Sequence, residues 1–131
     1  MTYSAAIAYL YGLQKHGIKL GLDNMRALME RLGHPERRVR SLHIGGTNGK
    51  GSTAAMTAAM LQAAGYRVGL YTSPHLVDFR ERIRINDAMI PEPRVADLTE
   101  RLQAVLSSDL VPTFFELTTA MAFLYFAEAS V

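Results

Sequence analysis

Apolar side chains recur at helical spacing in the first 36 residues of the chain. Residues 4–15 place alanine, leucine, isoleucine and tyrosine side chains on one broad face, which is typical of a packed helix. Asp23 is a suitable N-cap for a second helix, whose apolar side chains again fall on one side. Gly33 and Pro35 end that second helix. The pattern predicts a helical lead-in over residues 1–36.

The pattern changes over residues 37–71, where an apolar run, a glycine-rich stretch and an alanine- and methionine-rich stretch follow one another. Residues 39–44 predict a buried strand, residues 51–64 a helix and residues 67–71 a second strand. Because a helical crossover joins the two strands, we expect them to run parallel. The predicted fold class is α/β: a P-loop-containing parallel sheet flanked by helices, with the glycine loop at the carboxyl end of a strand.

Residues 72–92 lose this periodicity, apart from a short alternating run that begins at Arg82. Such a long excursion in a compact domain is more often functional than idle, so we interpret it as a functional loop. Residues 93–131 contain two further helical patterns. In the second of these, Thr113 and Glu116 match a capping box, which marks the start of a long apolar helix.

Composition narrows the classes of function. The formal charge is only +2 and there is no long basic run, so nucleic acid is not an expected partner. The chain has no cysteine, which excludes disulfides, thiolate nucleophiles and cysteine metal sites and is compatible with a reducing cytoplasm. No signal peptide is recognisable, and the most apolar segment, residues 117–129, is shorter than the roughly 20 residues that span a bilayer. We expect a cytoplasmic protein with no membrane partner.

The strongest chemical signal is the glycine-rich stretch behind the first predicted strand. Glycines let successive backbone N–H groups converge on phosphate oxygens, and a helix N-terminus adds partial positive charge. Lys50 supplies a full charge and is the candidate catalytic residue, while Ser52 or Thr53 offers a hydroxyl to magnesium. An ordinary glycine turn is the alternative; the lysine and the hydroxyl pair favour phosphate binding. The residues assigned to the phosphate cradle are Gly46, Thr47, Asn48, Gly49, Lys50, Gly51, Ser52 and Thr53.

The cradle departs from the Walker A pattern, because Gly51 stands between the lysine and the hydroxyl residue. Further specific motifs occur at Ala64–Leu76 and at Glu81–Asn86, with weaker support from residues 20–22 and 113–116. In these residues the chain closely resembles the amino-terminal part of the folylpolyglutamate synthase/dihydrofolate synthase family, within the Mur ligase superfamily. Cell-wall Mur ligases place Ser or Thr directly after the lysine, so Gly51 favours the folate branch. The resemblance implies the first part of a Mur-ligase-like central ATPase domain.

The resemblance implies an ATP-dependent acid–amino-acid ligase with ATP and Mg²⁺ as cofactors. ATP would phosphorylate a carboxylate of dihydropteroate or folate, and the amino group of L-glutamate would attack the acyl phosphate. Lys50 and the cradle would hold the phosphates, and magnesium would offset the remaining charge. Ser73 matches the family's magnesium-binding loop serine, although Ser-Pro is also a common turn initiator. Ser52 is a second candidate ligand by analogy with other P-loops.

The resemblance also implies two walls of a pterin or folate pocket. The residues assigned to them are Lys19, Leu20, Gly21 and Leu22 on one wall and Thr113, Phe114, Phe115 and Glu116 on the other. The capping box explains Thr113 and Glu116 without a ligand, yet it leaves Phe114 or Phe115 free to face an aromatic ring. Arg82 is a candidate for an anionic substrate, although loop arginines are usually solvated. We interpret His75 as a solvated loop histidine.

The family's second glycine-rich signature and its carboxyl-terminal domain do not occur in these 131 residues. We therefore expect an incomplete ATP-binding domain that is inactive alone and self-associates through uncovered apolar surface. A non-catalytic nucleotide-binding module is one alternative, and a fragment of a Mur-type cell-wall peptide ligase is another. The residues leave open whether the parent activity makes dihydrofolate, extends polyglutamate tails or does both.

Overall fold

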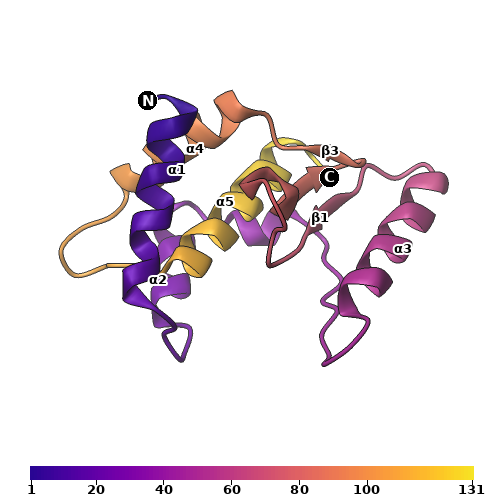
Figure 1. Ribbon diagram of the computed structural model, residues 1–131, viewed down its shortest axis with the longest axis horizontal. Coiled ribbons are helices and arrows are strands. Elements are labelled where there is room, and N and C mark those ends of the chain that lie inside the picture. The colour runs from indigo at the N-terminus through magenta and orange to yellow at the C-terminus, as the bar shows by residue number, and fades with distance from the viewer.

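The computed structural model describes all 131 residues. Helices dominate the architecture, and Figure 1 shows α1 and α3 at opposite ends of the molecule, with α5 and a small sheet between them. The α-helices are α1 (Tyr3–Gly12), α2 (Asp23–Arg31), α3 (Lys50–Ala63), α4 (Glu92–Ala104) and α5 (Phe114–Glu128). The short 3-10 helices are η1 (Leu13–His16), η2 (Pro35–Arg38) and η3 (Phe79–Arg82). None of these helices combines the length and apolarity that a membrane crossing requires.

The core is built around α5. Its sequence is apolar on every side, and a helix of that kind is stable only when it is surrounded. Accordingly α5 contacts α1, α2, α4 and η2, and the side chains of Leu117, Ala120 and Met121 are fully buried. The capping box predicted at its start is present: Glu116 N donates to Thr113 Oγ1 at 3.1 Å, and Thr113 N donates to Glu116 Oε1 at 2.9 Å.

The sheet is antiparallel. Its strands are β1 (Gly69–Tyr71), β2 (Ile83–Ile85) and β3 (Ala88–Met89), in the order β1-β2-β3. Leu70 pairs with Arg84, and Arg84 pairs in turn with Met89. The segment expected to be one long loop, residues 72–92, therefore contains η3 and a hairpin. Strands of only two or three residues are too short to give a clear period-2 signal, which is why the sequence pattern missed β3.

The second predicted strand forms as β1, but the first predicted strand and the parallel pairing between the two are absent. Residues 39–44 precede the glycine loop as the pattern requires, but they contain no strand, and Leu42 is 70% exposed. A parallel strand needs a neighbour for its backbone N–H and C=O groups. In this chain β1 is an edge strand that pairs only with β2, and residues 39–44 do not pair with its other edge or with any other strand.

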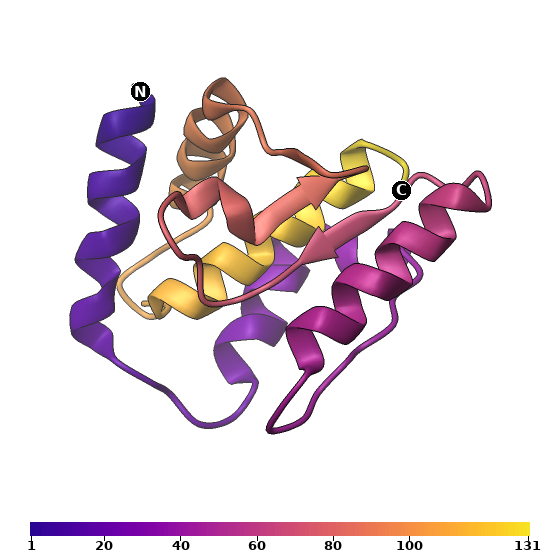
Figure 2. The same ribbon diagram turned by 45° about the vertical axis from the view of Figure 1, so that its right-hand side comes forward.

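Helix α3 packs loosely on the rest of the molecule. We expected its small side chains to approach a sheet closely, and α3 does contact β1. Only Ala58 is buried, however, while Met56 and Met60 are exposed. Figure 2 shows α3 lying beside the sheet at the edge of the molecule, on the side away from α1. The helix that follows the phosphate loop thus presents most of its surface to solvent.

Candidate functional site

The glycine loop ends in an uncapped helix N-terminus. Gly46 and Gly49 adopt φ angles of +147° and +76°, a region that side chains other than glycine rarely enter. Gly49 is the N-cap of α3 and offers no side chain to its first N–H groups. The first turn of α3 also lacks an acidic residue. The N–H groups of this turn therefore remain available to an anion, as a phosphate site requires.

Lys50 adds a full positive charge to this N-terminus. Its ammonium group folds back over the loop, where Nζ donates to the carbonyl oxygen of Gly46 at 3.3 Å. Every residue from 45 to 53 is exposed, so a ligand reaches the loop without any rearrangement of the core. The residues predicted for the cradle thus lie together at one helix end, and their chemistry fits the phosphates of a nucleotide.

The candidate magnesium ligands Ser52 and Ser73 lie in different segments. Ser52 is in the first turn of α3, and Ser73 follows β1; both are exposed. No group of three or more histidine, aspartate or glutamate side chains is arranged to hold a metal ion. Hydroxyl oxygens are hard ligands suited to magnesium, which normally completes its shell with water and substrate phosphates. The residues present therefore fit magnesium only together with a bound nucleotide.

The backbone after Ser73 is held by Glu81. Its carboxylate accepts hydrogen bonds from the N–H groups of Leu76, Val77 and Asp78 at 2.8, 3.0 and 2.7 Å. The Asp78 N–H, followed by those of Leu76 and Val77, lowers the pKa of Glu81 because each bond stabilises the charged form. Sequence reasoning did not identify this role for Glu81. Three convergent backbone bonds define the path of the loop that carries Ser73.

The two predicted walls of the pterin pocket meet through Asn24. Lys19 Nζ donates to Asn24 Oδ1 at 3.2 Å. Asn24 Nδ2 donates in turn to Glu116 Oε1 at 3.1 Å and to the carbonyl oxygen of Val111 at 3.2 Å. Both Asn24 and Glu116 are buried. The chain Lys19–Asn24–Glu116 therefore ties the loop after α1 to the start of α5; Asn24 was missed because a polar residue early in a helix ordinarily suggests only solvent exposure.

The two phenylalanines of the second wall have different surroundings. Phe114 is buried and packs edge-on against Tyr11 and Phe79, with ring centroids 5.8 and 6.1 Å apart. Phe115 is 54% exposed and stacks with Tyr71 at 6.3 Å. Only Phe115 presents a free ring face to a ligand. Phe114 belongs to the core. Of the two rings proposed to face a ligand, only that of Phe115 is exposed enough to do so.

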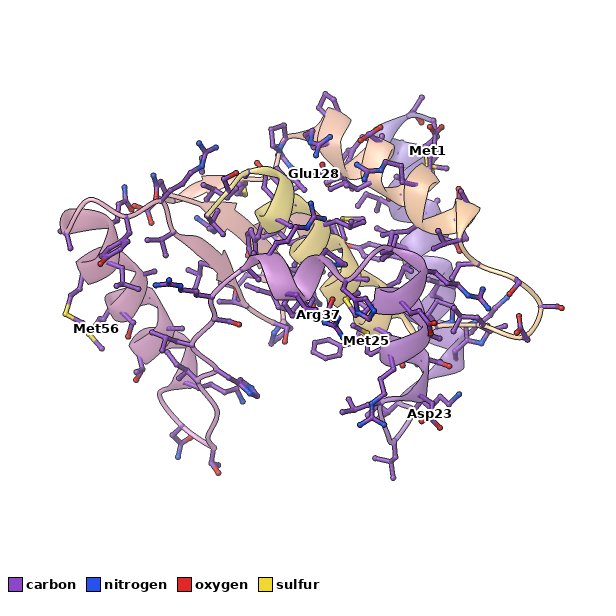
Figure 3. The ribbon with its side chains drawn as sticks, turned by 180° about the vertical axis from the view of Figure 1, so that it is seen from behind. Met1, Asp23, Met25, Arg37, Met56 and Glu128 are labelled. Carbon is purple, nitrogen blue, oxygen red and sulfur yellow. The ribbon has the colours of Figure 1, made fainter.

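Phe115 lines a hollow of about 610 Å³ beside α2 and η2. Leu22 and Glu116 also line it, so the hollow includes residues from both predicted walls. The remaining lining residues are Met25, Arg26, Met29, His34, Glu36, Arg37, Thr119 and Phe123. Figure 3 shows Met25 and Arg37 next to each other on this face, with Met56 far away on α3. Leu20 is 91% exposed and does not line the hollow.

Arg82 and His75 differ from their predicted surroundings. Arg82 is 7% exposed, its Nε donates to His75 Nδ1 at 2.7 Å, and its guanidinium lies 5.0 Å from the centroid of the Phe114 ring. His75 is half-buried, and its Nε2 lies 3.1 Å from the hydroxyl of Tyr11. The expectation that His75 was a solvated loop histidine is wrong, and the alternative of a solvated side chain for Arg82 is wrong as well. Arg82 ends η3 directly before β2 and is largely buried there, so its charge needs protein partners.

Similar proteins are found by sequence and by structure, although no protein-family model matches the chain. The dihydrofolate synthase/folylpolyglutamate synthase of Bacillus subtilis is 47% identical over 132 residues, a match that covers 97% of this chain and 31% of that protein. Folylpolyglutamate synthase from Thermotoga maritima is 46% identical with a TM-score of 0.90, covering 98% of this chain and 31% of the other. A complex of FPGS with AMPPCP and folate is 35% identical with a TM-score of 0.88, covering 100% and 33%.

The chain spans about a third of the length of these relatives. Over that third, the structural matches cover 98% and 100% of this chain. The comparisons therefore confirm the α/β class predicted from the sequence.

Proposed function

Because the chain belongs to the folylpolyglutamate synthase/dihydrofolate synthase family, matching its amino-terminal part, we propose that it provides the nucleotide phosphate site and part of the folate site of an ATP-dependent ligase. The observation that carries the proposal is the uncapped N-terminus of α3, with two glycines at positive φ and Lys50 folded over the loop. The proposed reaction joins L-glutamate to dihydropteroate or to a folate in the cytoplasm, with ATP and Mg²⁺ as cofactors.

The chemistry of amide formation explains why such a loop is needed. A carboxylate is a poor electrophile, and transfer of a phosphoryl group converts one of its oxygens into a leaving group. The transferring group carries negative charge, which the N–H groups of α3 and the ammonium of Lys50 stabilise. Magnesium, when bound through Ser52, Ser73 and the phosphates, would supply further positive charge. The amino group of L-glutamate then displaces phosphate from the acyl phosphate.

The hollow beside α5 supports the folate half of the proposal. Phe115 offers an aromatic face, and Leu22 offers apolar surface across the hollow. A flat pterin ring gains from both of these. The Lys19–Asn24–Glu116 hydrogen bonds hold the two walls together, so these residues act by shaping the pocket. Glu116 is already bonded to Thr113 and Asn24, which argues against a direct role in proton transfer.

The residues that bind phosphate are nevertheless open to water. All of residues 45–53 are exposed, and an acyl phosphate at that position would hydrolyse unless another part of a protein covered it. We therefore expect the 131-residue chain alone to bind Mg-ATP without completing ligation. Release of phosphate from ATP, dependent on both glutamate and dihydropteroate and close to the rate of a full-length relative, would contradict this expectation.

Calorimetry with three ligands tests the proposed function. We expect Mg-ATP and dihydropteroate to bind and a UDP-muramoyl peptide to give no heat, because Gly51 and the hollow beside Phe115 favour the folate branch. Binding of Mg-ATP alone would support a non-catalytic nucleotide-binding module instead. Binding of the UDP-muramoyl peptide in place of dihydropteroate would identify a cell-wall ligase fragment.

A further inference from the structure

A set of four side chains joins the loop that carries Ser73 to the amino end of α5. Arg82 Nε donates to His75 Nδ1 at 2.7 Å, and His75 Nε2 lies 3.1 Å from the hydroxyl of Tyr11. The guanidinium of Arg82 also lies 5.0 Å from the centroid of the Phe114 ring. The Tyr11 ring packs against Phe114 as well, at 5.8 Å, which closes the set into a ring of contacts.

The hydrogen bonds fix which nitrogen of His75 carries the proton. A guanidinium has donors and no acceptor, so Nδ1 must be the unprotonated nitrogen. Nε2 therefore bears the hydrogen and donates it to the Tyr11 hydroxyl. The imidazole also lies nearly parallel to the Tyr11 ring, at 7° between planes and 6.0 Å between centroids. Both nitrogens and one face of His75 are thus engaged by the protein.

The loop is fixed again just beyond His75. The Glu81 carboxylate holds the N–H groups of Leu76 and Val77, although the side chains of these residues are more than 85% exposed. The backbone is consequently held from one side by Glu81 and from the other by His75. Ser73 lies two residues before His75, so the anchored imidazole restrains the backbone that carries Ser73.

We propose that His75 and Arg82 are positioning residues that hold the Ser73 loop in a fixed relation to Phe114, and so couple the nucleotide and pterin sides of the site. The inference rests on the proposed function. Arg82 is 7% exposed and donates through Nε to His75, which gives it this structural link. Phe114 connects the set to the hollow, because the next residue of α5 is Phe115, whose ring lines the hollow.

The coupling is measurable as the Kd of dihydropteroate without AMPPCP divided by its Kd with saturating AMPPCP and magnesium. Calorimetry with the 131-residue chain gives both dissociation constants. We expect the nucleotide analogue to tighten dihydropteroate binding about fivefold or more, within the usual range for coupled sites. In His75→Phe, which retains an aromatic ring but neither nitrogen, the ratio should fall to within about twofold of one.

Two further variants separate positioning from stability. His75→Asn places an amide oxygen near the position of Nδ1 and can still accept from Arg82 but loses the contact with Tyr11, so it should recover part of the ratio. Leu98→Ala removes buried side-chain volume in α4, at a residue that is not a member of the set, and should lower the melting temperature while leaving the ratio unchanged. If His75→Phe does not fold, Tyr11→Phe removes only the hydroxyl and should lower the ratio by about half.

The outcomes are distinct. A folded His75→Phe chain, or a Tyr11→Phe chain in its place, with the wild-type ratio would overturn the positioning role. A wild-type ratio of one would overturn it too. Absence of any binding of AMPPCP or dihydropteroate to the wild-type chain would instead contradict the proposed function, on which the inference depends.

Discussion

A Cβ atom added to Gly69 would lie 2.7 Å from Cδ1 of Phe126. No side chain fits in that space, so the backbone of β1 approaches the ring of Phe126 on α5 as closely as only glycine allows. We predict that Gly69→Ala lowers the free energy of unfolding by about 1–3 kcal/mol, the usual cost of overpacking. Urea unfolding followed by circular dichroism measures the change.

Gly12→Ala is the matched control for Gly69→Ala. Gly12 ends α1 with a helical φ of −60°, and an added Cβ would meet nothing within 4 Å. This substitution should raise stability by about 0.4–1 kcal/mol, because alanine restricts the unfolded chain. If Gly69→Ala is as stable as the wild type, the close approach to Phe126 does not exist in solution.

Glu116 stabilises the chain through its buried hydrogen bonds. Glu116→Ala removes the acceptor for the Thr113 N–H and for Asn24 Nδ2. We expect a loss of about 1–3 kcal/mol in the free energy of unfolding, because a buried donor is left without a partner. Thermal and urea unfolding both report it.

The control for Glu116→Ala is Glu30→Ala, at an exposed position in α2. Removal of this carboxylate should change stability by less than about 0.5 kcal/mol. Equal effects of the two substitutions would show that loss of charge, and not loss of the Thr113–Asn24–Glu116 bonds, determines the result.

Asp78 makes the free energy of unfolding depend on pH under acidic conditions. The side-chain hydrogen bond from Arg80, at 2.8 Å between Nη2 and Oδ2, lowers the pKa of Asp78 below its ordinary value. A carboxylate with a lowered pKa in the folded state contributes stability that is fully present above its unfolded pKa of about 3.9. That contribution is lost as pH falls through the lower folded pKa.

The melting temperature of Asp78→Asn should therefore depend less steeply on pH than that of the wild type below about pH 4. Above this range the variant should be less stable by a constant amount. Asp87→Asn, at an exposed position in the β2–β3 turn, serves as the control and should leave the acid slope as it is. A parallel slope in Asp78→Asn and the wild type would exclude a stabilising Asp78–Arg80 pair.

Exposed apolar side chains on α3 predict self-association of the chain. Met56 and Met60 are 59% and 66% exposed, and Leu42 lies uncovered before the glycine loop. Light scattering after size-exclusion chromatography should detect dimers or larger species at micromolar concentration, and Met56→Lys with Met60→Lys should shift the distribution toward monomer. A wild-type chain that stays monomeric at all concentrations would contradict the prediction.

The α-helices and the glycine loop before α3 were predictable because each depends on local sequence. The apolar spacing of α5 and the capping box at Thr113 determine a helix start without reference to the rest of the chain. The pairing of β1 was not predictable in the same way. Residues 39–44 carry the apolar pattern of a strand, but strand formation depends on a partner far away in sequence, and no strand pairs with these residues.

In the candidate site, too, features set by local sequence were predictable and contacts between distant residues were not. The position of Gly49 and Lys50 at the start of a helix could be predicted from the sequence, because a glycine-rich stretch directly precedes an alanine-rich helical pattern. The surroundings of Arg82 and His75 could not, since their hydrogen bond forms only after η3 brings the two segments together. Asn24 likewise meets Glu116 across 92 positions of sequence. Contacts of this range leave no periodic signal in the chain.

Titration of Mg-ATP into the wild-type chain and into Lys50→Ala tests the central claim most directly. Lys15→Ala, which removes an exposed lysine from η1, is the control for net charge. We predict that Lys50→Ala weakens Mg-ATP binding at least about tenfold, as expected for loss of a charge-assisted phosphate contact, and that Lys15→Ala binds like the wild type. Equal affinity of the wild type and Lys50→Ala would contradict the assignment of the glycine loop as the phosphate site.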